Sequence, residues 1–426
     1  MGGSASRRIG AWGIGLVVAG LVAGALAIAG AVALLAIDHG SRSESGPVAP
    51  SPHRLQGPPW GFTAGWGDYC YRPLAAPRGY AAALVPPGEP CRPGSTRFTT
   101  EQQVDLTARA GASIDRLAIS WAAVERAAPV RRGGTIVHTF NWAPVSRVYR
   151  AMLAAGIRPV VLAYGAPTWA RRPGWERPGT CRAAHGELCS YPPSRRHLSD
   201  WRAFIEAAAR RLPRMAALEV WNEPNLPRFF APAPSPALYS RLLGAAHRSA
   251  HAAGATAPIL TGGLAAGTAE TGSGIPAPRF LASVYRLAGR GSFDGIGAHP
   301  YPSGPPWAER MTANLDGLRR VRDRFHDRGT PLWITEVGVG GTSSPRLQGS
   351  SGLARQGPAL VRMYRSTQNS DVRAFLVYAL RETKTEGPQF EPYGVARANL
   401  HPKPAYCYLA SHLGQGAHAA CGRMAP

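Results

Sequence analysis

The chain has 426 residues, of which 45% are hydrophobic, and a formal net charge of +23 at pH 7. This length suits one barrel-sized domain with insertions, and the hydrophobic content is sufficient for a substantial core. The positive charge favours acidic partners, such as an acidic glycan or an anionic membrane. It comes from arginines scattered along the chain rather than from a compact basic block, so we expect no nucleic-acid partner.

The N-terminus carries a long apolar run. Arg7 and Arg8 precede residues 9–37, which include no charged side chain. A cleavable signal peptide has an apolar core of about 7–15 residues, whereas a membrane-spanning helix needs about 20. The length therefore predicts a transmembrane signal anchor, with residues 1–8 in the cytoplasm and the rest of the chain outside. Cleavage near Ala31-Val32-Ala33, which would give a secreted protein, stays open.

A polar stretch rich in Pro, Ser and Gly follows the apolar run at residues 38–59. Such a composition predicts a linker between the membrane and a folded domain. Residues 60–426 show no second change of composition, so we expect them to form one extracytoplasmic domain. The protein would then be a single-pass protein of the cell membrane.

Six cysteines fit this oxidising location. They form three pairs that are close in sequence, and the simplest pairing joins Cys70 with Cys91, Cys181 with Cys189, and Cys407 with Cys421. Other pairings stay open. No cysteine spacing resembles a zinc site, and we expect neither a metal nor a cofactor.

Short apolar runs alternate with stretches of helical spacing along the predicted domain. The predicted strands are Gly61–Gly65, Ile114–Ser120, Arg158–Tyr164, Leu218–Asn222, Ile259–Gly263, Gly295–His299, Leu332–Glu336 and Ala374–Tyr378. The predicted helices include Asp200–Leu212, Ala237–Ala253, Met311–Arg328 and Gly357–Ser366. Eight such units predict an α/β fold, a closed (β/α)8 TIM barrel with a buried parallel sheet. The alternative is an open doubly wound sheet, but the Gly-rich turn typical of its first strand is missing.

Active sites of such barrels lie at the C-terminal ends of the strands. Polar and aromatic residues occur at these ends in the predicted strands: Arg116, Tyr164, Asn222, Glu223, His299, Tyr301, Glu336 and Tyr378. Glu223 and Glu336 end the fourth and seventh strands, which face each other across an eight-stranded barrel. Glycoside hydrolysis needs two carboxyl groups on either side of the scissile bond, and a separation of about 5–5.5 Å would predict a retaining mechanism.

Two motifs carry a family resemblance. Trp221-Asn222-Glu223-Pro224-Asn225 resembles the WNEP motif of clan A glycoside hydrolases, and Trp333–Gly338 resembles the strand-seven nucleophile motif of the same clan. The similarity extends over nearly the whole predicted domain and is nearest to families 39 and 5, which include xylosidases, iduronidases and endoglycanases. It implies a retaining O-glycosyl hydrolase with Glu223 as general acid/base and Glu336 as nucleophile.

The resemblance also implies roles for residues near the two carboxyls. Asn222 would bind the sugar 2-hydroxyl, and His299 and Tyr301 would line the sugar subsite, with Tyr301 orienting Glu336. The charge of Arg116 would stabilise ionised Glu336. Many clan A enzymes place a Trp near the end of strand eight, whereas this chain has Tyr378 there. The remaining candidates for sugar contacts are Tyr164 and Trp169, which follow the third strand.

Structural interpretations of these residues stay open. Glu223 and Glu336 could be buried ion-pair members, Asn222 a turn cap, Arg116 a partner of the inner carboxylate Glu219, and His299, Tyr301 and Trp169 packing residues. Two other functions also stay open: an inactive barrel that binds cell-surface glycan, and a transglycosylase. No Gly-x-Ser-x-Gly, His-Glu-x-x-His or phosphate-binding Gly-Lys-Ser/Thr motif indicates another enzyme class. We expect a monomer acting on carbohydrate.

Overall fold

The computed structural model describes residues 57–63, 99–174, 190–266, 274–341, 350–382, 393–414 and 421. The predicted anchor at residues 9–37, most of the predicted linker, and Cys70, Cys91, Cys181 and Cys189 lie outside these ranges. Within them, no helix is long and apolar enough to cross a membrane. The described residues all belong to one unit, Pro52–Pro426.

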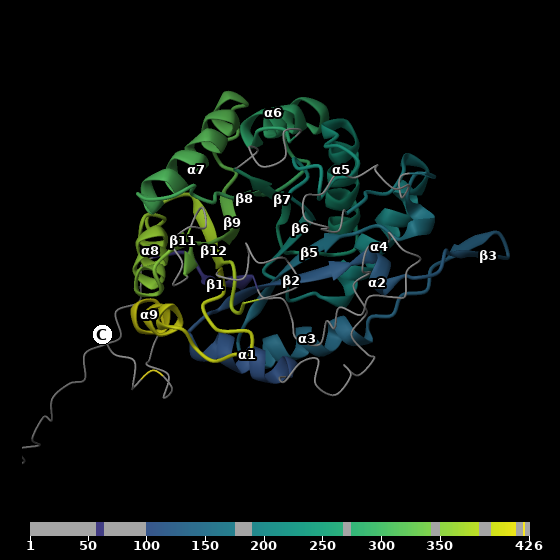
Figure 1. The fold of residues 1–426 in the computed structure, drawn as a ribbon. Coiled ribbons are helices and arrows are strands. Elements are labelled where there is room, and N and C mark those ends of the chain that lie inside the picture. The colour runs from purple at the N-terminus through teal and green to yellow at the C-terminus, as the bar shows by residue number, and fades with distance from the viewer. Residues whose placement is uncertain are drawn as a thin grey trace, which may run out of the picture. The chain divides into compact units, whose positions relative to one another are not determined.

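Eight parallel strands close into a barrel in which β1 pairs with both β12 and β2 (Figure 1). In pairing order the strands are β1 (Trp60–Thr63), β12 (Val372–Val377), β9 (Leu332–Val337), β8 (Ile296–His299), β7 (Ile259–Ala265), β6 (Ala217–Asn222), β5 (Arg158–Tyr164) and β2 (Ile114–Ser120). Each predicted strand is present within two residues of its predicted start. The (β/α)8 prediction is confirmed, and the open doubly wound sheet is excluded.

Helices surround the barrel in Figure 1. They are α1 (Thr100–Arg109), α3 (Ala143–Ala154), α4 (Leu198–Arg211), α5 (Pro236–Ala252), α6 (Ala277–Ala288), α7 (Trp307–Arg324), α8 (Leu353–Arg365) and α9 (Pro404–His412). Smaller elements are α2 (Trp121–Val124), the 3-10 turns at Thr168–Ala170 and Arg195–His197, the hairpin of β3 (Val130–Arg132) and β4 (Thr135–Val137), and the pair β10 (Gly340–Gly341) and β11 (Ser350–Ser351).

Local sequence sets where several helices begin and end. Thr99 and Gln102 form a capping box at the start of α1, because each side chain accepts a hydrogen bond from the other residue's backbone N–H. Gly111 and Gly156 follow α1 and α3 with φ of 81° and 75°, a left-handed conformation that glycine adopts without a Cβ clash. These turns lead the chain directly into β2 and β5.

The predicted bounds of α7 were wrong by one turn. The helix runs over Trp307–Arg324 rather than Met311–Arg328. Its start follows Pro306, whose φ suits a position just before a helix. At the other end, His326 has a φ of 55°, which no α-helix continues through.

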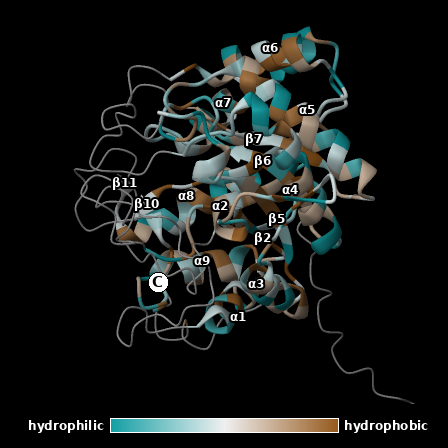
Figure 2. Ribbon diagram, turned by 90° about the vertical axis from the view of Figure 1, so that its right-hand side faces the viewer, coloured by the Kyte–Doolittle hydropathy of each residue, from teal (hydrophilic) through white to brown (hydrophobic). Residues whose placement is uncertain are grey.

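The core has two layers. The larger layer packs helices onto the outside of the barrel and includes Trp201 and Phe204 of α4, both with no exposed surface. Figure 2 shows hydrophobic and hydrophilic segments alternating along the outer helices, as expected for helices that bury one face. The inner layer fills the start of the barrel with small and branched side chains, among them Ile114, Val160 and Leu260. Nearer the carboxyl ends of the strands, the side chains inside the barrel are polar.

One predicted disulfide can be compared with the structure. Cys407 in α9 is bonded to Cys421, with a Cα–Cα distance of 5.5 Å. The structure thus pairs these two cysteines as the simplest pairing has them, and the bond ties α9 to Cys421.

Candidate active site

Arg116 on β2 connects three residues at the carboxyl end of the barrel. Strand alternation turns its side chain to the same face as Ile114, which is in the inner core layer. Its guanidinium donates from Nε to Glu219 Oε2 at 2.7 Å, from Nη1 to Glu336 Oε2 at 2.9 Å and from Nη2 to Asn222 Oδ1 at 2.8 Å. Arg116 thus contacts both the inner carboxylate and the candidate nucleophile.

Arg116 is only 4% exposed. Burial disfavours its charged form, but the negative charges of Glu219 and Glu336 outweigh this effect and raise the pKa of Arg116 above its ordinary value. The side chain is therefore a fixed positive charge within the site. A buried guanidinium with several oriented acceptors is also a rigid scaffold for them.

Glu219 holds Arg116 in this position by accepting a hydrogen bond from it. Its Oε1 accepts hydrogen bonds from Thr335 Oγ1 at 2.7 Å and from the backbone N–H of Gly263 at 2.8 Å, while Oε2 pairs with Arg116. The carboxylate is fully buried and is held by charge-assisted bonds from three strands, β2, β7 and β9. Thr335 was not among the predicted residues, although it lies beside Glu336 in the strand.

The turn after β6 presents the first candidate catalytic carboxyl. Trp221 and Glu223 have φ values of 74° and 40°, uncommon for residues other than glycine. Such strained residues persist only where the surroundings hold them, and they cluster at functional sites. Asn225 holds this turn by exchanging hydrogen bonds of 3.0 Å with the backbone of Ala265, in β7, and by donating to Ile275 O.

His299, the last residue of β8, is the hydrogen-bond partner of Glu223. Its Nδ1 lies 2.8 Å from Glu223 Oε1, and the ring is fully buried. Its Nε2 makes no hydrogen bond among the described residues and lies 4.0 Å from Glu219 Oε1. A neutral imidazole can either donate to a carboxylate or accept from a protonated carboxyl, depending on its tautomer. This partner is therefore compatible with both protonation states of Glu223.

Glu336, in β9, has two hydrogen-bond donors. Tyr301 donates to Glu336 Oε1 at 2.8 Å, and Arg116 donates to Oε2. Burial and the negative charge of Glu336 raise the pKa of Tyr301 well above its ordinary value, so the phenol keeps its proton. Donation to both oxygens fixes the orientation of this carboxyl group.

The two candidate carboxyls lie close together. One oxygen of Glu223, one of Glu336 and a ring nitrogen of His299 all lie within 4.8 Å of one another. Both glutamates are partly accessible, with side chains 11% and 15% exposed. An ionised carboxylate beside a second carboxyl that can exchange a proton is the arrangement needed for attack on an acetal and protonation of its leaving oxygen.

Three tyrosines form an aromatic group beside Glu336. The ring of Tyr301 lies edge-on to those of Tyr378 and Tyr393, with centroids 6.4 and 5.8 Å away, and the latter two are 5.9 Å apart. Tyr378 follows β12, where sequence analysis placed a candidate sugar contact. Tyr393 was missed, because it lies in a connection whose sequence has no motif that distinguishes it.

Two predicted contact residues lie on the side of β5. Tyr164 is the last residue of that strand and is half-buried. Trp169 packs edge-on against Trp121 and His197, each with ring centroids 5.5 Å from its own. Its indole N–H makes no hydrogen bond with the described residues. Trp169 thus belongs to an aromatic packing group, and no described contact joins it to the two carboxyls.

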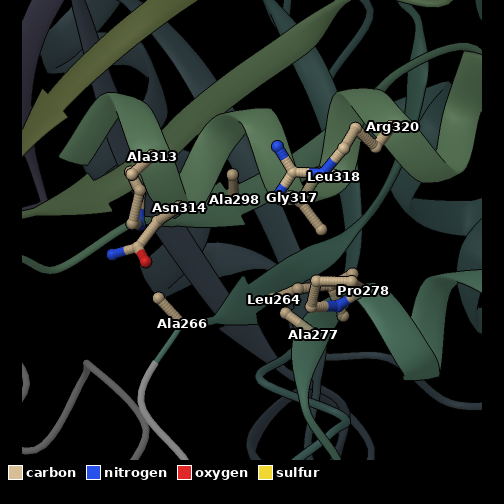
Figure 3. Close-up of a pocket in the computed structure, with 11 residues that line it drawn as sticks. Leu264, Ala266, Ala277, Pro278, Ala298, Ala313, Asn314, Gly317, Leu318 and Arg320 are labelled. Atoms are coloured by element: carbon tan, nitrogen blue, oxygen red, sulfur yellow. The ribbon is translucent and has the colours of Figure 1, made fainter. Parts of the chain in front are cut away.

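A cavity of about 280 Å³ lies near the ends of β7 and β8, between α6 and α7 (Figure 3). Its walls are mostly small and apolar, and neither catalytic candidate lines it. Asn314 on its wall donates to the backbone oxygen of Tyr301 at 3.1 Å. The cavity therefore lies beside Asn314, which supports Tyr301, and neither candidate carboxyl lines it.

The fold of this chain is similar to the folds of several solved structures. Neither protein-family models nor curated protein sequences match the chain. Among solved structures, the GH39 enzyme from Xanthomonas axonopodis pv. citri is similar with a TM-score of 0.54 and 18% identity, covering 75% of this chain and 63% of that one. A monomeric beta-xylosidase from Caulobacter crescentus CB15 gives a TM-score of 0.52 and 19% identity, covering 73% and 64%. A GH5 protein from Streptomyces cattleya gives a TM-score of 0.50 and 13% identity, covering 73% of each chain.

The chain spans less than two thirds of the length of the first two proteins. At these identities the similarity concerns the fold. The structure of this chain is therefore similar to the (β/α)8 barrels of family 39 and family 5 glycoside hydrolases, the two families that its sequence motifs resemble.

Proposed function

We propose that this protein is a retaining glycoside hydrolase in which Glu336 is the nucleophile and Glu223 the general acid/base. The observation that carries the proposal is the pair of carboxyl oxygens within 4.8 Å at the carboxyl end of the barrel. This limit is below the separation of about 6.5–9.5 Å between the carboxyls of inverting enzymes, and it supports the separation of about 5–5.5 Å typical of retaining ones.

The different partners of the two glutamates support their different roles. Glu336, with donors on both oxygens, attacks the anomeric carbon as a carboxylate. Glu223 transfers its proton to the departing oxygen, so that the glycosidic C–O bond breaks and a glycosyl ester forms on Glu336. Glu223, now ionised, removes a proton from water, whose oxygen then displaces Glu336 and restores both groups.

The surrounding residues fit positions around a bound sugar. Asn222 is oriented by Arg116, which leaves its amide nitrogen for the 2-hydroxyl group. His299 holds Glu223 through Nδ1, and Tyr301 keeps Glu336 in place. The three tyrosines, 301, 378 and 393, offer ring surface for sugar packing.

Hydrolysis of a panel of aryl glycosides and polysaccharides by the full chain tests the proposal. Glu223→Gln and Glu336→Gln should each lower kcat by at least about a thousandfold, whereas Glu309→Gln, at an exposed glutamate of α7, should act like the parent. Small nucleophiles such as azide should restore turnover to the Glu223 variant on substrates with good leaving groups. Equal activity in all four proteins would contradict the proposal.

The same panel separates the alternatives. An inactive glycan-binding barrel would retain affinity for a polysaccharide without turnover in any variant. A transglycosylase would give sugar-acceptor products in preference to hydrolysis. Acidic substrates would be indicated by faster turnover of uronate-bearing than neutral glycans, with a loss of that preference at high salt.

We also propose that the protein is a monomer held at the cell membrane by residues 9–37, with the barrel outside. The uncharged length of that segment and the Arg7-Arg8 pair before it support this orientation. The chain should remain in the membrane fraction after alkaline carbonate extraction, and external protease should cleave the barrel in intact cells. A soluble, N-terminally shortened chain would support the secreted alternative.

A further inference from the structure

We infer that His247, His251 and Asp294 form a binding site for a divalent transition-metal ion, with Zn²⁺ as the ion that fits best. Their ligand atoms all lie within 4.8 Å of one another. Two imidazoles and a carboxylate are donors that Zn²⁺ commonly takes, with a water in the fourth position. The inference does not depend on the proposed hydrolase activity.

The site is built from two separate elements. His247 and His251 are four residues apart in α5, so both project from one face of the helix. Asp294 lies just before β8, and its carboxylate faces both rings: Oδ1 is 3.0 Å from His247 Nε2, and Oδ2 is 3.0 Å from His251 Nε2. Tetrahedral zinc places neighbouring N and O ligands about 3.3 Å apart, so these two N–O distances need to change by only a few tenths of an ångström.

The hydrogen bonds around His251 point to a cation between the donors. Its Nδ1 lies 3.1 Å from the backbone oxygen of Ala255, which only accepts, so Nδ1 carries the hydrogen. In a neutral ring Nε2 then offers a lone pair, and it faces the lone pairs of Asp294 at 3.0 Å. A metal ion between these atoms would be bound by both of them.

The second histidine adds another imidazole beside the same carboxylate. The rings of His247 and His251 have centroids only 4.6 Å apart, and both face Asp294. One divalent ion between them would bind all three side chains. His251 also lies in the last turn of α5, where the partial negative charge of the helix end favours a cation.

Supporting hydrogen bonds fix the ligands in the way that metal sites require. Asp294 Oδ2 accepts from the backbone N–H of Ile259 at 2.8 Å, which orients the carboxylate, and Ala255 orients His251. The side chains of His247, His251 and Asp294 are 16%, 39% and 34% exposed, so solvent can reach the site and supply a water ligand.

The location indicates what the ion would do. Ile259 begins β7 and Asp294 precedes β8, so the site lies at the amino-terminal edge of the barrel, opposite Glu223 and Glu336. This edge of a TIM barrel serves stability rather than catalysis. A bound ion would tie α5 to the strands beside it and would stabilise the folded state by mass action.

Metal binding by the full chain without a histidine tag tests the inference. After treatment with a chelator and dialysis against Zn²⁺, the parent should hold one zinc ion per chain, and its melting temperature should rise by a few degrees. Co²⁺ should give visible absorption bands typical of low coordination number. His251→Gln and Asp294→Asn should each weaken binding by at least about tenfold and abolish the thermal shift.

Two control variants assign the effect to this site. His401→Gln, at a histidine outside the cluster, should bind as the parent does. Glu223→Gln should too, which separates this site from the catalytic carboxyls. Because His251→Gln alone can disturb α5, Asp294→Asn serves as the second variant, and circular dichroism checks that both are folded. No zinc uptake by the parent, or equal uptake by both cluster variants, would overturn the inference and leave two imidazolium–carboxylate ion pairs.

Discussion

Glu336 and Glu223 are distinguished by the side chains that bond to them. Glu336 accepts from Tyr301 and Arg116, whereas the partner of Glu223 is His299. Tyr301 and Arg116 only donate here, while an imidazole can either donate or accept. These neighbours support the roles proposed for the two glutamates, and point variants can test each of them.

Tyr301→Phe should lower kcat by about 10–100-fold, because it removes one charge-assisted hydrogen bond worth about 1.5–3 kcal/mol. The matched control is Tyr285→Phe. Tyr285 also donates to a carboxylate at 2.8 Å, that of Asp327, but lies away from the site. Steady-state kinetics of both variants decides the matter: a similar loss of kcat in the two would show that Tyr301 has only a structural effect.

Arg116→Lys should lower kcat/KM by about 100-fold or more, because an ammonium cannot hold Glu219, Glu336 and Asn222 in one planar geometry. Arg147→Lys, at an exposed arginine paired with Glu101, is the control and should keep parental kinetics. Parental kcat/KM in the Arg116 variant would mean that its charge alone suffices.

At the scale of elements, the strand ends were predictable and many of their contacts were not. A parallel strand buried on both faces is a continuous apolar run, so Ile114–Ser120 and Arg158–Tyr164 are found at their predicted bounds. Glu223 and Glu336 could be identified because each belongs to a motif at such an end. Contacts between units depend on barrel closure, which sequence periodicity does not encode.

The unpredicted residues illustrate this limit. Tyr393 joins the site from a late connection, and Thr335 bonds to Glu219 across the barrel interior. His247 and His251 have a helical spacing that is equally common on solvated faces, and only the fold brings Asp294 beside them. Cys407 with Cys421 could be predicted because the two are near in sequence.

Close strand packing gives a prediction for β7. A Cβ at Gly263 would lie 2.0 Å from His299 Nε2, so Gly263→Ala must displace that buried ring. We expect a loss of kcat/KM of about 100-fold or more together with a destabilisation of about 1–3 kcal/mol. Gly329→Ala, where a Cβ meets nothing within 4 Å, is the matched control. Steady-state kinetics and thermal melting check this prediction. Equal kcat/KM and equal melting temperatures in the two variants would contradict it.

The ion pairs between α7 and β12 give a pH-dependent prediction. Asp371, just before β12, bonds to Arg319 at 2.6 Å and also to Arg322. Burial would raise the pKa of Asp371, but these hydrogen bonds outweigh it and hold the pKa below its ordinary value of 3.8. Asp371→Asn should therefore lower the free energy of unfolding by about 1–3 kcal/mol at neutral pH.

The lowered pKa of Asp371 determines the direction in which stability changes with pH. The stabilisation by Asp371 is complete above its ordinary pKa of 3.8. It is lost as the pH falls through the lowered pKa of the folded state. Urea denaturation from pH 7 down to about pH 2.5 should show the parent and Asp371→Asn converging at the acidic end. Asp316→Asn, at an exposed partner of Arg319, should cost less than about 1 kcal/mol. A difference independent of pH would contradict the role of the charge.

At the scale of the whole molecule, the two proposals assign different tasks to the two edges of the barrel. The carboxyl edge collects Arg116, Glu223, His299, Tyr301 and Glu336, and the amino edge carries the inferred metal site. Arg319 and Arg322 tie α7 to Asp371, just before β12, and the inferred ion would tie α5 to the strands beside it. This division is the usual one in barrels of this kind, where loops at one end carry chemistry and the other end maintains the fold.

The stereochemistry of the reaction tests the central claim most directly. Proton NMR of the first sugar released by the full chain, recorded before mutarotation, reports the configuration at the anomeric carbon. Two displacements through Glu336 predict that the product keeps the configuration of the substrate. An inverted first product would contradict the account, because it would require water rather than Glu336 to attack the sugar.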